Sequence, residues 1–200
     1  MLAVVLSRID MREFDQMVSL YTREQGKVEL LAKGIKKITS KNSSNLEVFS
    51  VVDIEVAPGK EINHLTKVQP LKIFQHIFSD FDKIYVAGYG IRIAKENILV
   101  GEKDERVFDF LVSFLEFLDT ATSVNSLNLA SAFILKLWHY LGFSPEKSEH
   151  SIWLEGDWQS INNKNIPVAE QHAIHNKVIN FAQHHVGKQL AKFVEHGRMN

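Results

Sequence analysis

Apolar and polar residues alternate with a period of two through much of the first 70 or so residues, as they do in half-buried β-strands. The segment Met17–Thr22 is the clearest case, because Val18 and Leu20 alternate with Ser19 and Tyr21. The pattern predicts five strands, which cover Leu2–Ile9, Met17–Thr22, Lys27–Ala32, Val48–Val56 and Ile62–Val68.

The predicted strands are short and are separated by glycine turns at Gln25-Gly26 and Pro58-Gly59. Five such strands in a row indicate a small barrel. The OB fold, whose loops and one sheet face often bind nucleic acid, fits this pattern, and an SH3-like barrel fits it nearly as well. The sequence therefore predicts a β-barrel domain over residues 1–75.

Beyond residue 80 the apolar residues recur every three or four positions, which indicates helices. Three helices are predicted at about 83–99, 105–119 and 127–141. A fourth helical run begins near Pro167 and reaches His185. These helices predict a second domain over residues 80–200.

One segment of the second half has a different pattern. Residues Ile152–Ile161 are predicted to form a β-hairpin with Glu155-Gly156-Asp157 as its turn. The predicted fold class is therefore α+β with two domains: an N-terminal barrel, then a helical C-terminal domain with a small β-hairpin insertion.

Composition excludes several classes of protein. The 200 residues include no cysteine, which excludes disulfides and thiolate zinc sites. The apolar runs are too short for a transmembrane helix, and the apolar segment Met1–Leu6 lacks the flanks of a signal peptide. We therefore expect a cytoplasmic protein with no membrane partner.

Catalytic and metal-binding patterns are weak. His172 and His175 lie one helical turn apart, but no third ligand follows at a recognisable spacing. We find no glycine-flanked serine nucleophile and no phosphate-binding loop. We expect neither an enzyme nor a metal or other cofactor.

Charge is concentrated in one stretch. The chain has a net charge of −1, whereas residues 21–45 carry six basic and two acidic side chains, a balance of +4. Most of the basic residues lie in or beside the segment 33–41, which is termed the cationic loop. A polyanion is the natural partner of such a loop, and a solvated surface loop without a partner is the alternative.

Two segments resemble the RecO family. Arg8, Glu13, Asp15, the run VSLYTREQGK at Val18–Lys27 and the cationic loop resemble its N-terminal module. The run LWHYLGFSP at Leu137–Pro145 resembles its helix that ends in a leucine-leucine-glycine-tyrosine-x-proline motif. The two segments occur in the family's order.

The resemblance implies an N-terminal OB fold and a helical C-terminal domain. It also implies a role in DNA repair and homologous recombination after DNA damage. The protein would bind single- and double-stranded DNA, anneal complementary strands, and help to load RecA on strands coated by single-stranded DNA-binding protein. RecR and the acidic C-terminal tail of single-stranded DNA-binding protein would be direct partners, and RecA an indirect one.

Many relatives carry a four-cysteine zinc module after the proline motif, and this chain has none. We expect Trp153 and Trp158 to supply the core of that region instead.

The candidate DNA-binding residues are basic or hydroxylic side chains, because lysine and arginine neutralise phosphate. They are Arg8, Arg23, Lys27, Lys33, Lys36, Lys37, Ser40 and Lys41. Arg8 could equally form an ion pair with Glu13 or Asp15. Phe14, Tyr21 and Phe49 are the aromatic residues nearest in sequence that could stack on bases, and Tyr21 is predicted to pack in the core instead.

Two other functions stay open. A protein–protein adaptor whose barrel has lost DNA binding would fit the slightly negative net charge. A hydrolase that uses the histidine-rich C-terminal helix is the more distant alternative.

Overall fold

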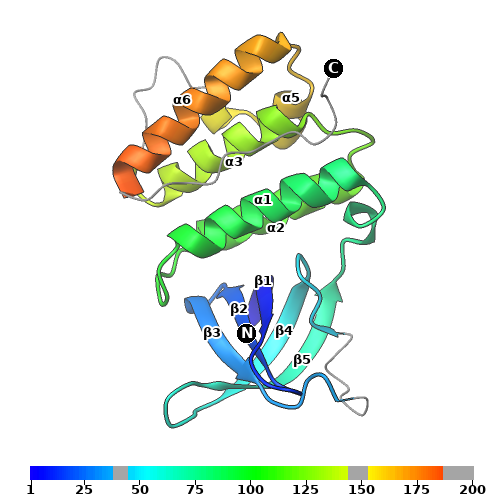
Figure 1. Cartoon of the computed structure of the whole chain (residues 1–200), viewed down its shortest axis with the longest axis vertical. Helices are drawn as coiled ribbons and strands as arrows, with labels where there is room; N and C mark the ends of the chain where they lie inside the picture. The colour runs from blue at the N-terminus through cyan, green and yellow to red at the C-terminus, as the bar shows by residue number, and fades with distance from the viewer. Residues whose placement is uncertain (38–44, 144–152, 187–200) are drawn as a thin grey trace. The chain divides into compact units, whose positions relative to one another are not determined.

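The computed structural model describes residues 1–37, 45–143 and 153–186. The strands are β1 (Leu2–Asp10), β2 (Gln16–Thr22), β3 (Gly26–Ala32), β4 (Val51–Ala57) and β5 (His64–Lys72). The helices are η2 (Gln75–Ile77), α1 (Phe81–Asn97), α2 (Glu105–Thr120), α3 (Ser126–Tyr140), α5 (Trp158–Asn162) and α6 (Val168–Val186). The predicted order of five strands followed by helices is confirmed (Figure 1).

The five strands form a closed barrel in the order β1-β2-β3-β5-β4. β4 pairs with β1 to close it, and every neighbouring pair is antiparallel except β3 and β5. Those two strands run parallel and meet at Leu31 and His64. This strand order is that of the OB fold, so the sequence-based prediction of an OB barrel is confirmed, and the SH3-like alternative is excluded.

The barrel core follows from the alternation seen in the sequence. Every second side chain of a strand points inward, and most of the inward positions are aliphatic. The buried cluster contains Ala3, Val5, Val18, Leu20, Leu30, Ala32, Ile35, Leu46, Val52, Ile54, Leu65 and Val68.

Two strand boundaries differ from the prediction by three residues or more. β4 begins at Val51 and not at Val48, because Phe49 has a left-handed backbone with φ of 72° that interrupts the extended chain. The ring of Phe49 is buried, which offsets the conformational cost. β5 continues past Pro70 to Lys72, because a register shift between Val51 and Val52 accommodates the proline.

The compact unit that contains the barrel also includes residues 98–115. Residues 98–104, termed the docking segment, lie against the turn between β2 and β3. The amide of Gly101 donates to the carbonyl of Lys27 at 2.8 Å. The Tyr21 hydroxyl donates to the Asp104 carbonyl and accepts from the Asp104 amide, each at 3.0 Å. Tyr21 is 1% exposed, so its predicted place in the core is confirmed.

Contacts divide the chain into two compact units. The first comprises residues 1–75 and 98–115, and the second comprises residues 76–97 and 116–200. The units differ from the predicted domains in the placement of residues 98–115. Whether residues 1–75 and 80–200 fold as independent domains stays a prediction.

In the second unit α3 is the central helix, and both α1 and α6 pack against it (Figure 1). Its residues from Ser126 to Leu135 are all buried, so this helix is covered on every side. Asn125 begins the helix as its N-cap, with a side chain that accepts from the amide of Asn128. In the parts of the chain that the structure describes, no helix is both long and apolar enough to cross a membrane.

The predicted β-hairpin at Ile152–Ile161 is wrong, because residues 153–155 are helical and α5 covers Trp158–Asn162. Asp157 is the N-cap of α5 and accepts from the amide of Ser160 at 2.7 Å. The Lys136 ammonium donates to the carbonyls of Leu154 and Gly156 at 2.6 and 2.9 Å. The segment Glu155–Asp157, which the sequence predicts to be a β-turn, therefore lies where two short helices meet.

Both tryptophans of this region are buried, as the sequence predicts. The Lys136 ammonium lies 5.5 Å from the ring centroid of Trp158, and that of Lys164 lies 5.4 Å from the ring centroid of Trp153. These cation–π contacts add to the packing of the two buried rings, which form the core of this segment.

We predict that Gly26→Ala destabilises the chain far more than Gly101→Ala. Both glycines have positive φ, 69° and 81°, so each substitution costs about 1–2 kcal/mol of backbone strain. A Cβ at Gly26 would in addition overlap the carbonyl of Glu102 in the docking segment, whereas nothing lies near one at Gly101. The Gly26→Ala loss should exceed about 3 kcal/mol.

Urea denaturation of the two variants measures this difference in the free energy of unfolding. Equal losses for the two variants would show that the docking segment does not pack closely on the β2–β3 turn.

Candidate nucleic-acid interface

Two loops of the barrel bring basic side chains together: the β1–β2 loop (residues 11–15) and the residues after β3 (33–37). Together they line an open pocket of about 440 Å³, termed the basic pocket. Its lining residues are Arg12, Glu13, Phe14, Asp15, Lys33, Gly34 and Lys37.

Two hydrogen bonds from backbone amides hold the two loops against each other. The amide of Lys36 donates to the carbonyl of Phe14 at 3.1 Å, and the amide of Gly34 donates to the Asp15 carboxylate at 2.8 Å. Gly34 has a φ of 62°, which turns the chain after β3, and Ile35 is buried in the barrel core. The pocket is thus positioned by the backbone.

The cations of the basic pocket are exposed. Arg12, Lys33 and Lys37 are all exposed, and the Lys37 ammonium lies 5.8 Å from the centroid of the Phe14 ring. Within the described ranges, neither Arg12 nor Lys33 has a carboxylate partner. Glu13 and Asp15 also line the pocket, so the described part of its lining has one positive charge in excess.

Lys36 lies beside the pocket and is paired. Its ammonium forms an ion pair with Asp10 at 2.7 Å, and Gln16 donates to the other oxygen of that carboxylate at 2.8 Å. The hydrogen bond from Lys36, followed by that from Gln16, holds the pKa of Asp10 below its ordinary value. Lys36 is therefore partly neutralised before any ligand binds.

Arg8 is committed to the barrel itself. Its guanidinium donates to the side chain of Gln16 at 3.0 Å and to the carbonyl of Leu46 at 2.7 Å, and it lies 3.7 Å from Glu47. Arg8 therefore contacts these three residues and not Glu13 or Asp15, the ion-pair partners that the sequence suggests.

Arg23 and Lys27 contact residues 98–109 of their own unit. The Lys27 side chain is buried, and its ammonium donates to the carbonyl of Ile98 at 2.9 Å. Arg23 pairs with Asp109 at 3.2 Å and lies 3.6 Å from Glu105. Both side chains therefore stabilise the packing of the docking segment and the first turns of α2.

Of the predicted site, Lys33 and Lys37 line the pocket and Lys36 lies beside it. Arg8 is linked to Lys36 through Gln16 and Asp10 but is bonded to the barrel, and Arg23 and Lys27 contact residues 98–109. Ser40 and Lys41 lie outside the described residues. Sequence reasoning missed Arg12. Its position in the β1–β2 loop was the available signal, since OB folds often bind ligands with that loop.

The described residues offer no metal centre, because nowhere in 1–37, 45–143 and 153–186 do three histidine or carboxylate side chains gather as ligands. His175, one of the two histidines considered from sequence, is buried and lies 3.0 Å from the Ser131 hydroxyl through its Nδ1. His172 is exposed.

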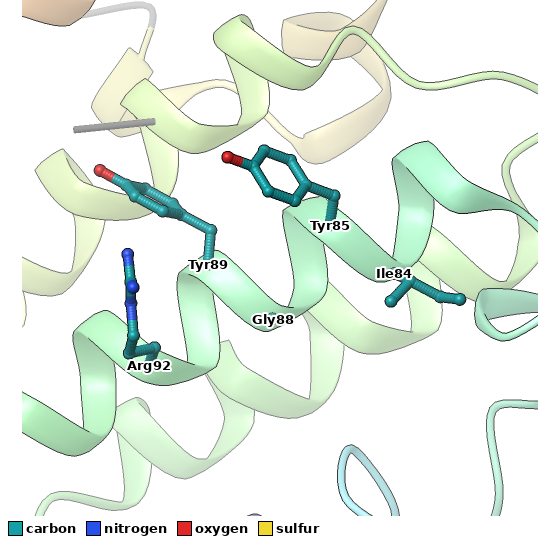
Figure 2. A pocket seen from close by; sticks show the side chains of 5 residues that line it. All are labelled: Ile84, Tyr85, Gly88, Tyr89 and Arg92. Carbon is teal, nitrogen blue, oxygen red and sulfur yellow. The ribbon is translucent and has the colours of Figure 1, made fainter. Parts of the chain in front are cut away.

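A second pocket lies in the helical unit. Its described lining comes from α1 alone, and its volume is about 330 Å³. Figure 2 shows the side chains of Tyr85, Tyr89 and Arg92 projecting from the same side of the helix. The lining residues are Ile84, Tyr85, Gly88, Tyr89 and Arg92, and they are termed the α1 pocket.

The α1 pocket combines apolar walls with one cation. Gly88 lies between Ile84 and Arg92 in the row of residues spaced by four, and its lack of a side chain leaves a hollow between them. The Arg92 guanidinium lies 5.8 Å from the centroid of the Tyr89 ring. Such a site suits an apolar group that carries a carboxylate.

Comparison with known proteins gives a consistent result. The family model described as recombination protein O N terminal matches residues 1–74, and that described as recombination protein O C terminal matches residues 78–152. Together the two models cover about three quarters of the chain.

Similar curated proteins are named DNA repair protein RecO. That of Desulfitobacterium hafniense is 26% identical over 147 residues, which are 74% of this chain and 53% of the relative. That of Geobacter sulfurreducens is 33% identical over 117 residues, which are 58% of this chain and 48% of the relative. This chain thus spans about half the length of the curated relatives it matches. With both family models matched in order, the chain belongs to the RecO family.

Proposed function

We propose that this chain is a DNA repair and recombination mediator that binds DNA through the basic pocket. The observation that carries the proposal is the exposed group Arg12, Lys33 and Lys37, on two loops of an OB barrel that hydrogen bonds from backbone amides hold together. Cations that keep no carboxylate partner are available to neutralise phosphate. The names of the relatives support the same role.

The proposed activities are binding of single- and double-stranded DNA, annealing of complementary strands, and help in loading RecA on strands coated by single-stranded DNA-binding protein. Neutralising phosphates lowers the repulsion between two strands, which is the physical requirement for annealing. RecR is a further proposed partner.

We assign the phosphate contacts to Arg12, Lys33 and Lys37, with Lys36 as a paired neighbour that can exchange Asp10 for a phosphate. Arg8, Arg23 and Lys27 are proposed as supports of the barrel, because each is engaged with other parts of the protein. Ser40 and Lys41 stay candidates by their position in the cationic loop.

The prediction that tests this assignment uses Arg12→Ala with Lys33→Ala. Losing two phosphate contacts should weaken binding of a single strand about tenfold or more at 0.1 M salt. The slope of log K against log salt should become flatter by about 1.4, at about 0.7 for each contact. Both residues are exposed, so the free energy of unfolding should change by less than about 0.5 kcal/mol for each.

Two controls accompany that measurement. Lys103→Ala with Lys177→Ala removes the same charge from exposed positions outside the pocket and should leave the slope unchanged. Glu13→Gln removes a carboxylate from the pocket and should strengthen binding. If the Arg12/Lys33 variant binds as the unchanged chain does, the adaptor without DNA binding becomes the better account.

A second part of the proposal concerns protein partners. The acidic tail of single-stranded DNA-binding protein, which ends in phenylalanine, has the chemistry that the α1 pocket suits. Ile84 and the two tyrosines would contact the terminal ring, and Arg92 would pair with the terminal carboxylate.

We predict that a labelled acidic peptide ending in phenylalanine binds the chain, and that Arg92→Glu weakens this binding at least about tenfold, since a hydrogen bond to a charged group is worth about 1.5–3 kcal/mol. Gly88→Leu should weaken it as well by filling the hollow. Fluorescence anisotropy measures both, with Glu96→Gln, an exposed change on the same helix, as the control. Unchanged affinity in both pocket variants would exclude this site.

A further inference from the structure

Of the three aromatic residues near the cationic loop, the structure leaves one in contact with solvent. Tyr21 is 1% exposed and Phe49 is 8% exposed, whereas Phe14 is 41% exposed. Single apolar side chains are common at protein surfaces, so the exposure of Phe14 makes its ring accessible but does not by itself mark a site. Among the described residues that line the basic pocket, Phe14 is also the one aromatic side chain.

The backbone that carries Phe14 is held in place by hydrogen bonds. Its carbonyl accepts from the amide of Lys36 at 3.1 Å, and the next residue, Asp15, accepts from the amide of Gly34. The carbonyl of Asp15 also accepts from the amide of Met11 at 3.1 Å. The loop is thus held in place, and its Phe14 ring lies beside the Lys37 ammonium in the absence of a ligand.

We propose that Phe14 is a stacking platform for one unpaired base, which makes the basic pocket prefer single strands to duplex. This inference rests on the proposed function, since it needs DNA in the same pocket. A strand whose phosphates contact Arg12 and Lys33 has its bases within reach of a ring in the same lining.

The contact of Lys37 with the ring is compatible with this role. The ammonium lies over the ring in the free protein, at 5.8 Å from its centroid. A cation–π contact at an exposed site is weaker than stacking of a base on an aromatic ring, so a base can displace the ammonium. Lys37 is then free to meet the neighbouring phosphate.

Stacking predicts selectivity that charge alone does not. Bases inside a duplex are stacked on both faces, so only the two end pairs have a free face for Phe14, whereas a phosphate contact is made to either form of DNA. Removing the ring should therefore weaken the binding of single strands and leave both duplex binding and the salt slope unchanged.

The experiment measures binding of the full chain to three probes of equal length: a thymidine 15-mer, the same strand with abasic sugars, and a blunt duplex. Phe14→Leu keeps an apolar side chain and removes the π-face, Phe14→Trp keeps a π-face, and Phe14→Ala removes both. We expect Phe14→Leu and Phe14→Ala to bind the 15-mer about tenfold more weakly, with less than twofold change on the abasic strand and the duplex. Phe14→Trp should bind the 15-mer at least as well as the unchanged chain.

Two results overturn the inference. One is a Phe14→Leu variant that binds the 15-mer as the unchanged chain does. The other is an equal loss on all three probes. The Arg12→Ala/Lys33→Ala variant distinguishes a failure of base stacking from a failure of the proposed DNA site. If this variant binds all three probes more weakly while Phe14→Leu binds them as the unchanged chain does, DNA binds the basic pocket without stacking on Phe14. If neither variant changes binding, the basic pocket is not the DNA site.

Discussion

The first unit depends on a hydrogen-bonded contact between two parts of the chain that lie far apart in sequence. The Tyr21 hydroxyl both donates to and accepts from the backbone of Asp104, at 3.0 Å each. Burial raises the pKa of this phenol to about 12, so it stays protonated and able to donate. Gly26, which leaves no room for a side chain against Glu102, lets the docking segment approach the β2–β3 turn.

This contact accounts for the division of the basic residues into two groups. Those next to the turn, Arg23 and Lys27, are used to hold residues 98–109. The exposed cations gather instead where the β1–β2 loop meets the chain after β3, together with Phe14. The basic residues of a stretch that is cationic in sequence are thus partly structural and partly available to a ligand.

Local patterning predicted most of the fold because strands and helices repeat with periods of two and 3.6. It failed where a local signal has two meanings, as at Glu155–Asp157, where turn residues serve as a helix cap. It also failed for side chains with distant partners: Lys27 bonds a carbonyl 71 residues away, and Arg23 bonds a carboxylate 86 residues away. The left-handed Phe49 has no signal in sequence, because it depends on where the ring is buried.

In the proposed function DNA binds the basic pocket and not the turn that holds the docking segment. Amide chemical-shift changes in an ¹⁵N-labelled chain titrated with a thymidine oligonucleotide test this assignment residue by residue. We expect the largest changes at residues 11–15 and 33–37, with little change at 21–27 and 98–104. Changes concentrated at 21–27 and 98–104, with the two loops of the basic pocket unaffected, would show that DNA binds at the docking segment instead.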